Sequence, residues 1–261
     1  MQDVLSPLTP ADYHFLLGII EGPIDLLNSG QLRALVNAVE EDDNADNRAA
    51  LNQQLEHEIR YLGSADFAYF FRKTTGREPG VPFSEIVRDT AKTLKIRLSS
   101  LGTEREMLEE LVQEYATQQF AKLSPEEQQD LLESLGVERE RAASFLKKSA
   151  GVFALPTLIQ AFGTIVVQGL IKTVIFGIIA KIIGKQLATR LFKFLFSRLP
   201  WWVSWIGPAA WTLSIGWAAL DIQGPASRKT IPIVLYLGLC SLREKEGVEE
   251  SGSRRAGESE R

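Results

Sequence analysis

The sequence has almost none of the residues that hold metal ions or form disulfide bonds. Its 261 residues include two histidines, His14 and His57, and one cysteine, Cys240. A single cysteine excludes an intrachain disulfide, and no compact group of His, Cys, Asp and Glu has the spacing of a metal site. His57 stands between two glutamates, which point in different directions on a helix. We therefore expect no metal centre.

Motifs of catalysis and cofactor binding are lacking as well. The sequence has no Walker A motif, no glycine-rich dinucleotide loop and no serine nucleophile elbow. Segment 72–77, RKTTGR, lacks the glycine spacing of a phosphate-binding loop. The aromatic cluster 67–71 lacks the interleaved basic residues that stacking on nucleic-acid bases requires. We predict a protein that is no enzyme, binds no cofactor and has no nucleic-acid partner.

Acidic residues are missing from a long part of the chain. There is no Asp or Glu between Glu140 and Asp221, although the whole protein has 33 of them. Residues 1–150 carry 26 Asp/Glu and 16 Lys/Arg, whereas residues 151–220 carry six Lys/Arg and no acid. The protein's net charge of −4 is therefore the sum of an acidic part and a cationic, apolar part.

Residues 1–150 carry helical periodicity and helix start signals. Thr9-Pro10-Ala11-Asp12 and Ser124-Pro125-Glu126-Glu127 each combine a capping residue, a proline at the first helical position and an acid at the third. Further apolar stripes at helical spacing cover 31–39, 49–62, 83–98 and, most clearly, 104–120. The acidic run 40–46 reads as a solvated loop or as a site for a basic partner. We predict an all-α domain here.

The acid-free stretch has the composition of a membrane-contacting region. Segments 152–171 and 199–220 hold no charge and are each about long enough to cross a bilayer. Between and beside them we predict cationic membrane contacts at Lys172, Lys181, Lys185, Arg190, Lys193 and Arg198. Tryptophan favours the headgroup level, which adds Trp201, Trp202, Trp205, Trp211 and Trp217 to this prediction.

Four glycines suggest close helix packing inside the same stretch. Gly163, Gly169, Gly177 and Gly184 fall on a sector of their own, and small residues let helices approach closely in membranes. A spanning hairpin conflicts with the positive-inside rule, because the connection is cationic and the acidic domain has no signal peptide. The hairpin could instead lie flat in the cytoplasmic leaflet, stay buried until triggered, or form the core of a larger helical protein.

The sequence thus predicts an all-α protein with four segments. These are an acidic helical domain (1–150), a hydrophobic, cationic helical hairpin (151–221), a turn with a C-terminal helix (222–245) and a disordered tail rich in Glu, Arg, Gly and Ser (246–261). Thr230 is a candidate cap for the C-terminal helix.

Two stretches resemble the bacterial YaaW family. Segment 224–243, GPASRKTIPIVLYLGLCSLR, is similar to that family's small-residue turn, Arg, Thr-Ile-Pro and helix ending in Cys-x-x-Arg, and 11–16 resembles its opening motif. The motif residues are Gly224, Pro225, Arg228, Thr230, Ile231 and Pro232. The resemblance implies a helical fold and, through the grouping of that family with ubiquinol-cytochrome c chaperones, a protein-binding role without catalytic residues.

Two functions stay open at this point. The first is a non-enzymatic helical protein whose hairpin embeds in or perturbs a bilayer, as in pore-forming or membrane-remodelling proteins. The second is a chaperone-like assembly factor, with a partner polypeptide facing the aromatic cluster 67–71 or the acidic run 40–46. We expect anionic lipid as a partner, a protein partner or homo-oligomer as the alternative, and a cytoplasmic domain with peripheral or integral attachment to the inner membrane.

Overall fold

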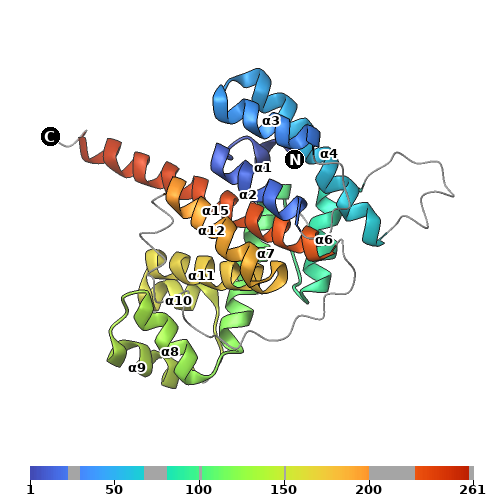
Figure 1. Ribbon diagram of the computed structural model, residues 1–261. Helices are drawn as coiled ribbons and strands as arrows, with labels where there is room; N and C mark the ends of the chain where they lie inside the picture. The colour runs from blue at the N-terminus through green and yellow to red at the C-terminus, as the bar shows by residue number, and fades with distance from the viewer. Residues whose placement is uncertain (23–29, 68–80, 100–101, 150, 200–226, 259–261) are drawn as a thin grey trace.

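The protein is an assembly of helices packed around one C-terminal helix (Figure 1). The computed structural model describes residues 1–22, 30–67, 81–99, 102–149, 151–199 and 227–258. Over these ranges the chain forms twelve α-helices and no strand, which confirms the all-α prediction. The helices are α1 (Gln2–Leu5), α2 (Pro10–Ile20), α3 (Gly30–Glu41), α4 (Ala45–Phe67), α6 (Phe83–Thr93), α7 (Glu104–Ala121), α8 (Pro125–Ser134), α9 (Arg139–Ser149), α10 (Leu155–Phe162), α11 (Thr164–Ile183), α12 (Lys185–Arg198) and α15 (Ser227–Glu258).

Capping boxes begin three of these helices. The two predicted boxes are confirmed, since the Thr9 side chain accepts from the Asp12 amide and the Ser124 side chain from the Glu127 amide, with the acid bonding back in each case. A third box, which we did not predict, begins α7 at Thr103. Each box satisfies amide groups that the first helical turn leaves without partners.

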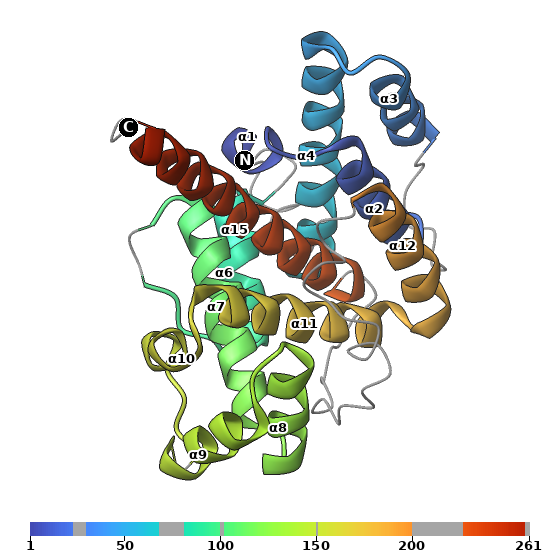
Figure 2. The ribbon, with the colours of Figure 1, turned by 90° about the vertical axis from the view of Figure 1, so that its left-hand side faces the viewer.

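Helix α15 lies at the centre of the fold. Every residue from 229 to 242 is buried, and α15 packs against α7, α11, α4, α2, α6 and α1. Figure 2 shows it passing between α7 and α11 on one side and α2 and α4 on the other. A helix that is apolar on all sides is stable only when neighbours cover it completely. The predicted segments 1–150, 151–221 and 222–245 therefore share one hydrophobic core.

The predicted hairpin differs from the observed structure. Segment 152–171 is not one helix, because Gly163 adopts φ +87° and ends α10 before α11 begins. Gly184 has the same φ and separates α11 from α12. A positive φ is favourable for glycine and strained for other residues. Gly163 and Gly184 are therefore helix ends, which corrects their prediction as packing glycines, while Gly169 is buried and Gly177 half-buried within α11.

Helix α11 is the one described helix that is long and apolar enough to cross a membrane. However, 61% of its most apolar window is buried inside the protein, against α15, α7, α10 and α12. Lys172 lies in its middle and is only 1% exposed. Lys172 therefore faces the protein interior, which corrects its prediction as a membrane contact. The second predicted span, 199–220, lies outside the described residues except for Leu199.

The family-motif residues lie at the start of α15. Arg228, Thr230, Ile231 and Pro232 are inside the helix, which already begins at Ser227, so the predicted Thr-Ile-Pro turn is helical and Thr230 is no cap. Gly224 and Pro225 lie outside the described residues. At its other end α15 continues to Glu258, through most of the predicted disordered tail. Glu and Arg, which are favourable in helices, make up eight of the sixteen residues of this tail, whereas its three glycines are unfavourable.

Three buried tyrosines are expected to make the folded protein less stable at alkaline pH. Burial raises the pKa of Tyr13 to about 12 and also raises the pKa of Tyr115 and Tyr236 above the ordinary value. Between the unfolded-state pKa near 10 and the folded-state pKa, the unfolded chain loses protons that the folded protein keeps. We expect the free energy of unfolding to be unaffected by these groups below about pH 9 and to fall above about pH 10, by roughly 1.4 kcal/mol per pH unit for each tyrosine.

Urea denaturation at a series of alkaline pH values measures this slope. The matched variant is Tyr115→Phe, because the Tyr115 hydroxyl has no hydrogen-bond partner among the described residues. This variant removes one titrating group without breaking a hydrogen bond, so its slope should be shallower. Equal slopes in the variant and the parent protein would contradict the assignment of Tyr115.

Candidate functional site: a cationic helix and a buried carboxylate cluster

The predicted membrane contacts of α11 and α12 are on the protein surface, apart from Lys172. Lys181, Lys185, Arg190, Lys193 and Arg198 are all exposed. The five predicted tryptophans, Trp201, Trp202, Trp205, Trp211 and Trp217, lie outside the described residues. The structure therefore supports a cationic surface on α12 and the last turn of α11.

Helix α12 presents this surface because its other face is packed into the core. Its buried residues are Ala188, Leu191, Phe192 and Leu195. The Phe192 ring stacks on Phe15 of α2, with ring centroids 5.7 Å apart, and meets Phe176 of α11 edge to face at 5.2 Å. These contacts fix the rotation of α12, so its lysines and Arg190 point away from the core.

An open groove of about 570 Å³ runs along this surface. Lys181, Lys185, Thr189 and Lys193 line it at four-residue intervals, and Phe192 and Phe196 form its apolar floor together with Ala180 and Ala188. Residues four apart lie one above the other on a helix. Cations beside a floor of apolar side chains in one groove suit a ligand with both an anionic and an apolar part.

Acidic side chains from α3 and the turn after it pair with specific basic residues. Glu40 bonds to His14 Nε2 at 2.7 Å and forms an ion pair with Arg198 at 3.3 Å, and Asp43 pairs with Arg48. The predicted acidic run 40–46 thus spans the end of α3, an interhelical turn and the start of α4, and two of its five acids form ion pairs within the protein. Within the described part of the chain, no acidic side chain pairs with Lys185, Arg190 or Lys193.

A second polar cluster surrounds Asp12, whose side chain is fully buried. Its carboxylate accepts hydrogen bonds from the Thr9 amide and hydroxyl, both at 2.7 Å, from the Tyr236 hydroxyl at 2.6 Å and from the Arg243 guanidinium at 2.8 Å. The Cys240 thiol lies 3.8 Å from the same carboxylate. The cluster joins the start of α2 to the buried part of α15.

The electrostatics of the cluster keep Asp12 and Arg243 as an ion pair beside neutral neighbours. Burial, followed by the Asp12 charge, raises the pKa of Tyr236 and of the Cys240 thiol well above their ordinary values. Burial alone would lower the pKa of Arg243, but Cys240 and Asp12 outweigh it and raise that pKa. A thiol kept protonated is a poor nucleophile. The arrangement therefore serves to hold two helices together.

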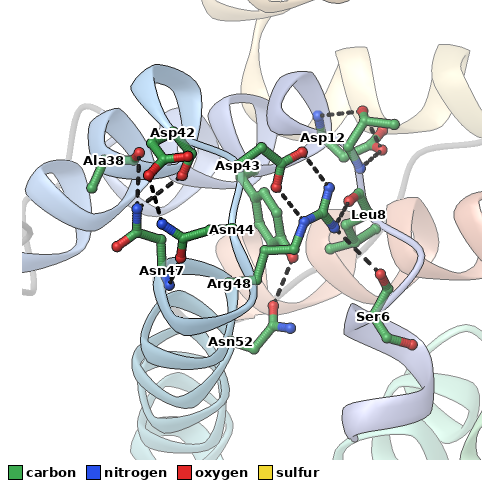
Figure 3. Close-up of polar contacts among 12 residues, drawn as sticks. Ser6, Leu8, Asp12, Ala38, Asp42, Asp43, Asn44, Asn47, Arg48 and Asn52 are labelled. Atoms are coloured by element: carbon green, nitrogen blue, oxygen red, sulfur yellow. Dashed lines mark hydrogen bonds and ion pairs between the residues drawn. The ribbon is translucent and has the colours of Figure 1, made fainter.

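Two arginines hold the segment before α2 in place. Arg243 donates to the Pro7 carbonyl at 2.9 Å, and Arg48 of α4 donates to the Leu8 carbonyl at 2.9 Å. Figure 3 shows Arg48 between Asp43 and this segment. The Tyr13 hydroxyl donates to Asn52 at 2.7 Å. Sequence reasoning identified Asp12 as a capping residue and missed its pairing with Arg243. Asp12 lies in 11–16 and Arg243 in 224–243, the two stretches that resemble the YaaW family, and that resemblance was the only hint in the sequence that both residues matter.

The described residues contain no group of three or more His, Cys, Asp and Glu side chains that could hold a metal ion. His14 contacts Glu40 and the Phe194 ring, the latter with centroids 5.1 Å apart. His14 therefore lies where α2 contacts α3 and α12.

Comparisons with known proteins give distant bacterial relatives. No family model matches the chain, and no solved structure matches it. A UPF0174 protein of Helicobacter pylori strain J99 is 25% identical over 226 residues, covering 84% of this chain and 82% of the relative. A UPF0174 protein of Helicobacter pylori strain 26695 is 20% identical over 218 residues, covering 81% of this chain and 97% of the relative. Over most of its length, the chain is therefore similar to bacterial proteins of the UPF0174 family.

Proposed function

We propose that this protein is a non-enzymatic helical protein that binds peripherally to anionic membrane surfaces. The observation that carries the proposal is the exposed set Lys185, Arg190 and Lys193 on α12, in a stretch without a single acid from 141 to 220. Surfaces of water-soluble helices normally mix charges of both signs. A cationic surface beside apolar side chains is complementary to an anionic headgroup layer.

Peripheral binding fits the described helices better than a spanning hairpin. Crossing a bilayer would require α11 to leave its contacts with α15 and α7, and α15 is itself buried on all sides. It would also move Lys172 from the core into hydrocarbon, where a lysine at a helix centre costs at least about 2.5 kcal/mol. Binding through α12 requires neither change. On this proposal the protein works at the cytoplasmic face of the inner membrane.

The chaperone-like alternative rests on the resemblance to the YaaW family. Of the two surfaces it would use, the acidic run 40–46 is exposed, and two of its five acids, Glu40 and Asp43, form ion pairs within the protein. The aromatic cluster lies outside the described residues except for the Phe67 backbone in α4. We therefore prefer the membrane-binding proposal.

Co-sedimentation with vesicles tests the proposal. We expect the full chain to bind vesicles of phosphatidylglycerol and phosphatidylcholine at moderate salt and not to bind phosphatidylcholine alone. Replacing both Lys185 and Lys193 by glutamine should weaken binding about 30-fold, since each basic residue near such a surface contributes about 1 kcal/mol. The matched control, Lys92→Gln with Lys122→Gln, removes two exposed cations from α6 and the end of α7 and should bind as the parent protein does. Equal weakening by both pairs would show non-specific attraction and would contradict a role for α12.

A further inference from the structure

The corner formed by the turn after α9, by α10 and by the first turn of α11 exposes apolar side chains in a stretch of sequence without charged residues. Between Lys148 and Lys172 the chain carries no charged residue. Val152 is 76% exposed, Ile165 58% and Ile159 37%. They make up three of the four large apolar side chains that are exposed in the described residues, the fourth being Tyr61 on α4.

The exposure of these side chains follows from how the corner is anchored. Phe153 packs against Phe120 of α7 and Phe145 of α9, with ring centroids 5.0 and 6.0 Å apart. Leu158 and Phe162 of α10 are buried, and Phe162 meets the Phe145 ring at 4.7 Å. Phe153, Leu158 and Phe162 thus face the protein interior, and Val152, Ile159 and Ile165 are left on the surface.

Polar contacts fix the same corner from α9. The Val152 amide donates to the Ser149 carbonyl at 2.9 Å, which closes the turn directly after the helix. The Arg141 guanidinium donates to the Ala161 carbonyl and lies 5.9 Å from the centre of the Phe162 ring. Val152, Ile159 and Ile165 are therefore presented on a supported surface.

Cations border the corner. Lys147 and Lys148 are exposed in the last turn of α9, five and four residues before Val152. The nearest acid along the chain is Glu140, at the opposite end of that helix. Apolar side chains at a tip, with lysines beside them, match a bilayer surface in which phosphates lie just above the acyl chains.

We propose that this corner, through Val152, Ile159 and Ile165, inserts into the acyl boundary of an anionic phospholipid bilayer, with Lys147 and Lys148 at the headgroup phosphates. The inference rests on the proposed function and deepens it, because it assigns the penetrating contact to a surface other than α12. The corner lies at the start of α11 and α12 follows the end of α11, so the two surfaces flank α11 at its two ends (Figure 2). A second copy of the chain is the competing occupant of such a surface.

A fluorescent reporter at the tip tests the insertion directly. Val152→Cys is labelled with an environment-sensitive dye under native conditions, in which the buried Cys240 does not react and labelling reaches one dye per chain. On phosphatidylglycerol-containing vesicles we expect a blue shift and protection from an aqueous quencher. The control label at Gln31→Cys, exposed on α3, should show neither change. Co-sedimentation without a shift at 152 would overturn the inference and leave the proposed function standing, whereas loss of co-sedimentation itself would overturn the proposed function.

Substitutions separate lipid insertion from self-association. Replacing Val152 and Ile165 by serine should weaken vesicle binding roughly tenfold or more, because two aliphatic side chains then no longer leave water. Tyr61→Ser, which removes an exposed large side chain from α4, should leave vesicle binding unchanged. Thermal unfolding followed by circular dichroism checks that each variant is folded. A blue shift at 152 that grows with protein concentration in the absence of vesicles would assign the corner to a second copy of the chain and overturn the inference.

Discussion

Replacing Arg243 by methionine is expected to lower the free energy of unfolding by about 3–5 kcal/mol, because it leaves the Asp12 carboxylate buried without its cation. Asp12 is 0% exposed, and the Arg243 side chain is 14% exposed. The substitution also removes the donor to the Pro7 carbonyl, so the segment before α2 loses one of its two arginines. Urea denaturation near neutral pH measures the effect.

Two further variants make that result specific to the buried pair. Arg33→Met removes the partner of Glu21 in an ion pair whose arginine is 61% exposed, and it should cost no more than about 1 kcal/mol. Combining Arg243→Met with Asp12→Asn should recover part of the lost stability, since no uncompensated charge then stays buried. If the Asp12→Asn addition made the protein still less stable, the buried charge would not be the cause of the loss.

The boundaries of the predicted helices were readable where the signal is local. The capping boxes at Thr9 and Ser124 depend on residues three positions apart, and both are confirmed. The apolar stripe of 104–120 likewise corresponds to α7. In these cases the backbone groups of one helical turn are satisfied by side chains of the same turn, so tertiary structure adds little.

Which helices pack against one another could not be predicted from local sequence patterns. The same uncharged sequence 164–171 suits a bilayer or a protein core, and only the position of α15 decides that α11 is buried. Gln168 and Lys172 are four residues apart and lie on the same side of α11, yet the two differ in burial because α11 is covered from several sides. The pairing of Asp12 with Arg243 crosses 231 residues of sequence and leaves no periodic signal.

Glycines show the same division between local and long-range information. Their positions on one helical sector suggested one packing face for four glycines, but a positive φ at Gly163 and Gly184 makes two of them helix ends. Gly238 on α15, in contrast, permits a close approach to the backbone of another helix. A Cβ at this position would lie 2.9 Å from the Leu108 carbonyl oxygen of α7 and would also collide with the Val112 side chain.

We therefore expect Gly238→Ala to lower the free energy of unfolding by about 2–3 kcal/mol, although alanine is the better helix former by about 1 kcal/mol. The cost arises because a backbone carbonyl cannot move without displacing α7, which makes extensive contacts with α15. Thermal and urea unfolding of the variant measure the loss.

Gly18→Ala on α2 is the matched control, because it also adds one methyl group to a helical glycine in a crowded contact. There the new Cβ meets only the end of the Leu191 side chain on α12, which can change its rotamer. We expect this variant to differ from the parent protein by less than about 1 kcal/mol, since the gain in helix propensity offsets a small rearrangement. Equal losses for the two variants would mean that the α7–α15 contact yields as readily as the α2–α12 contact, and that α15 does not hold the core as tightly as its burial indicates.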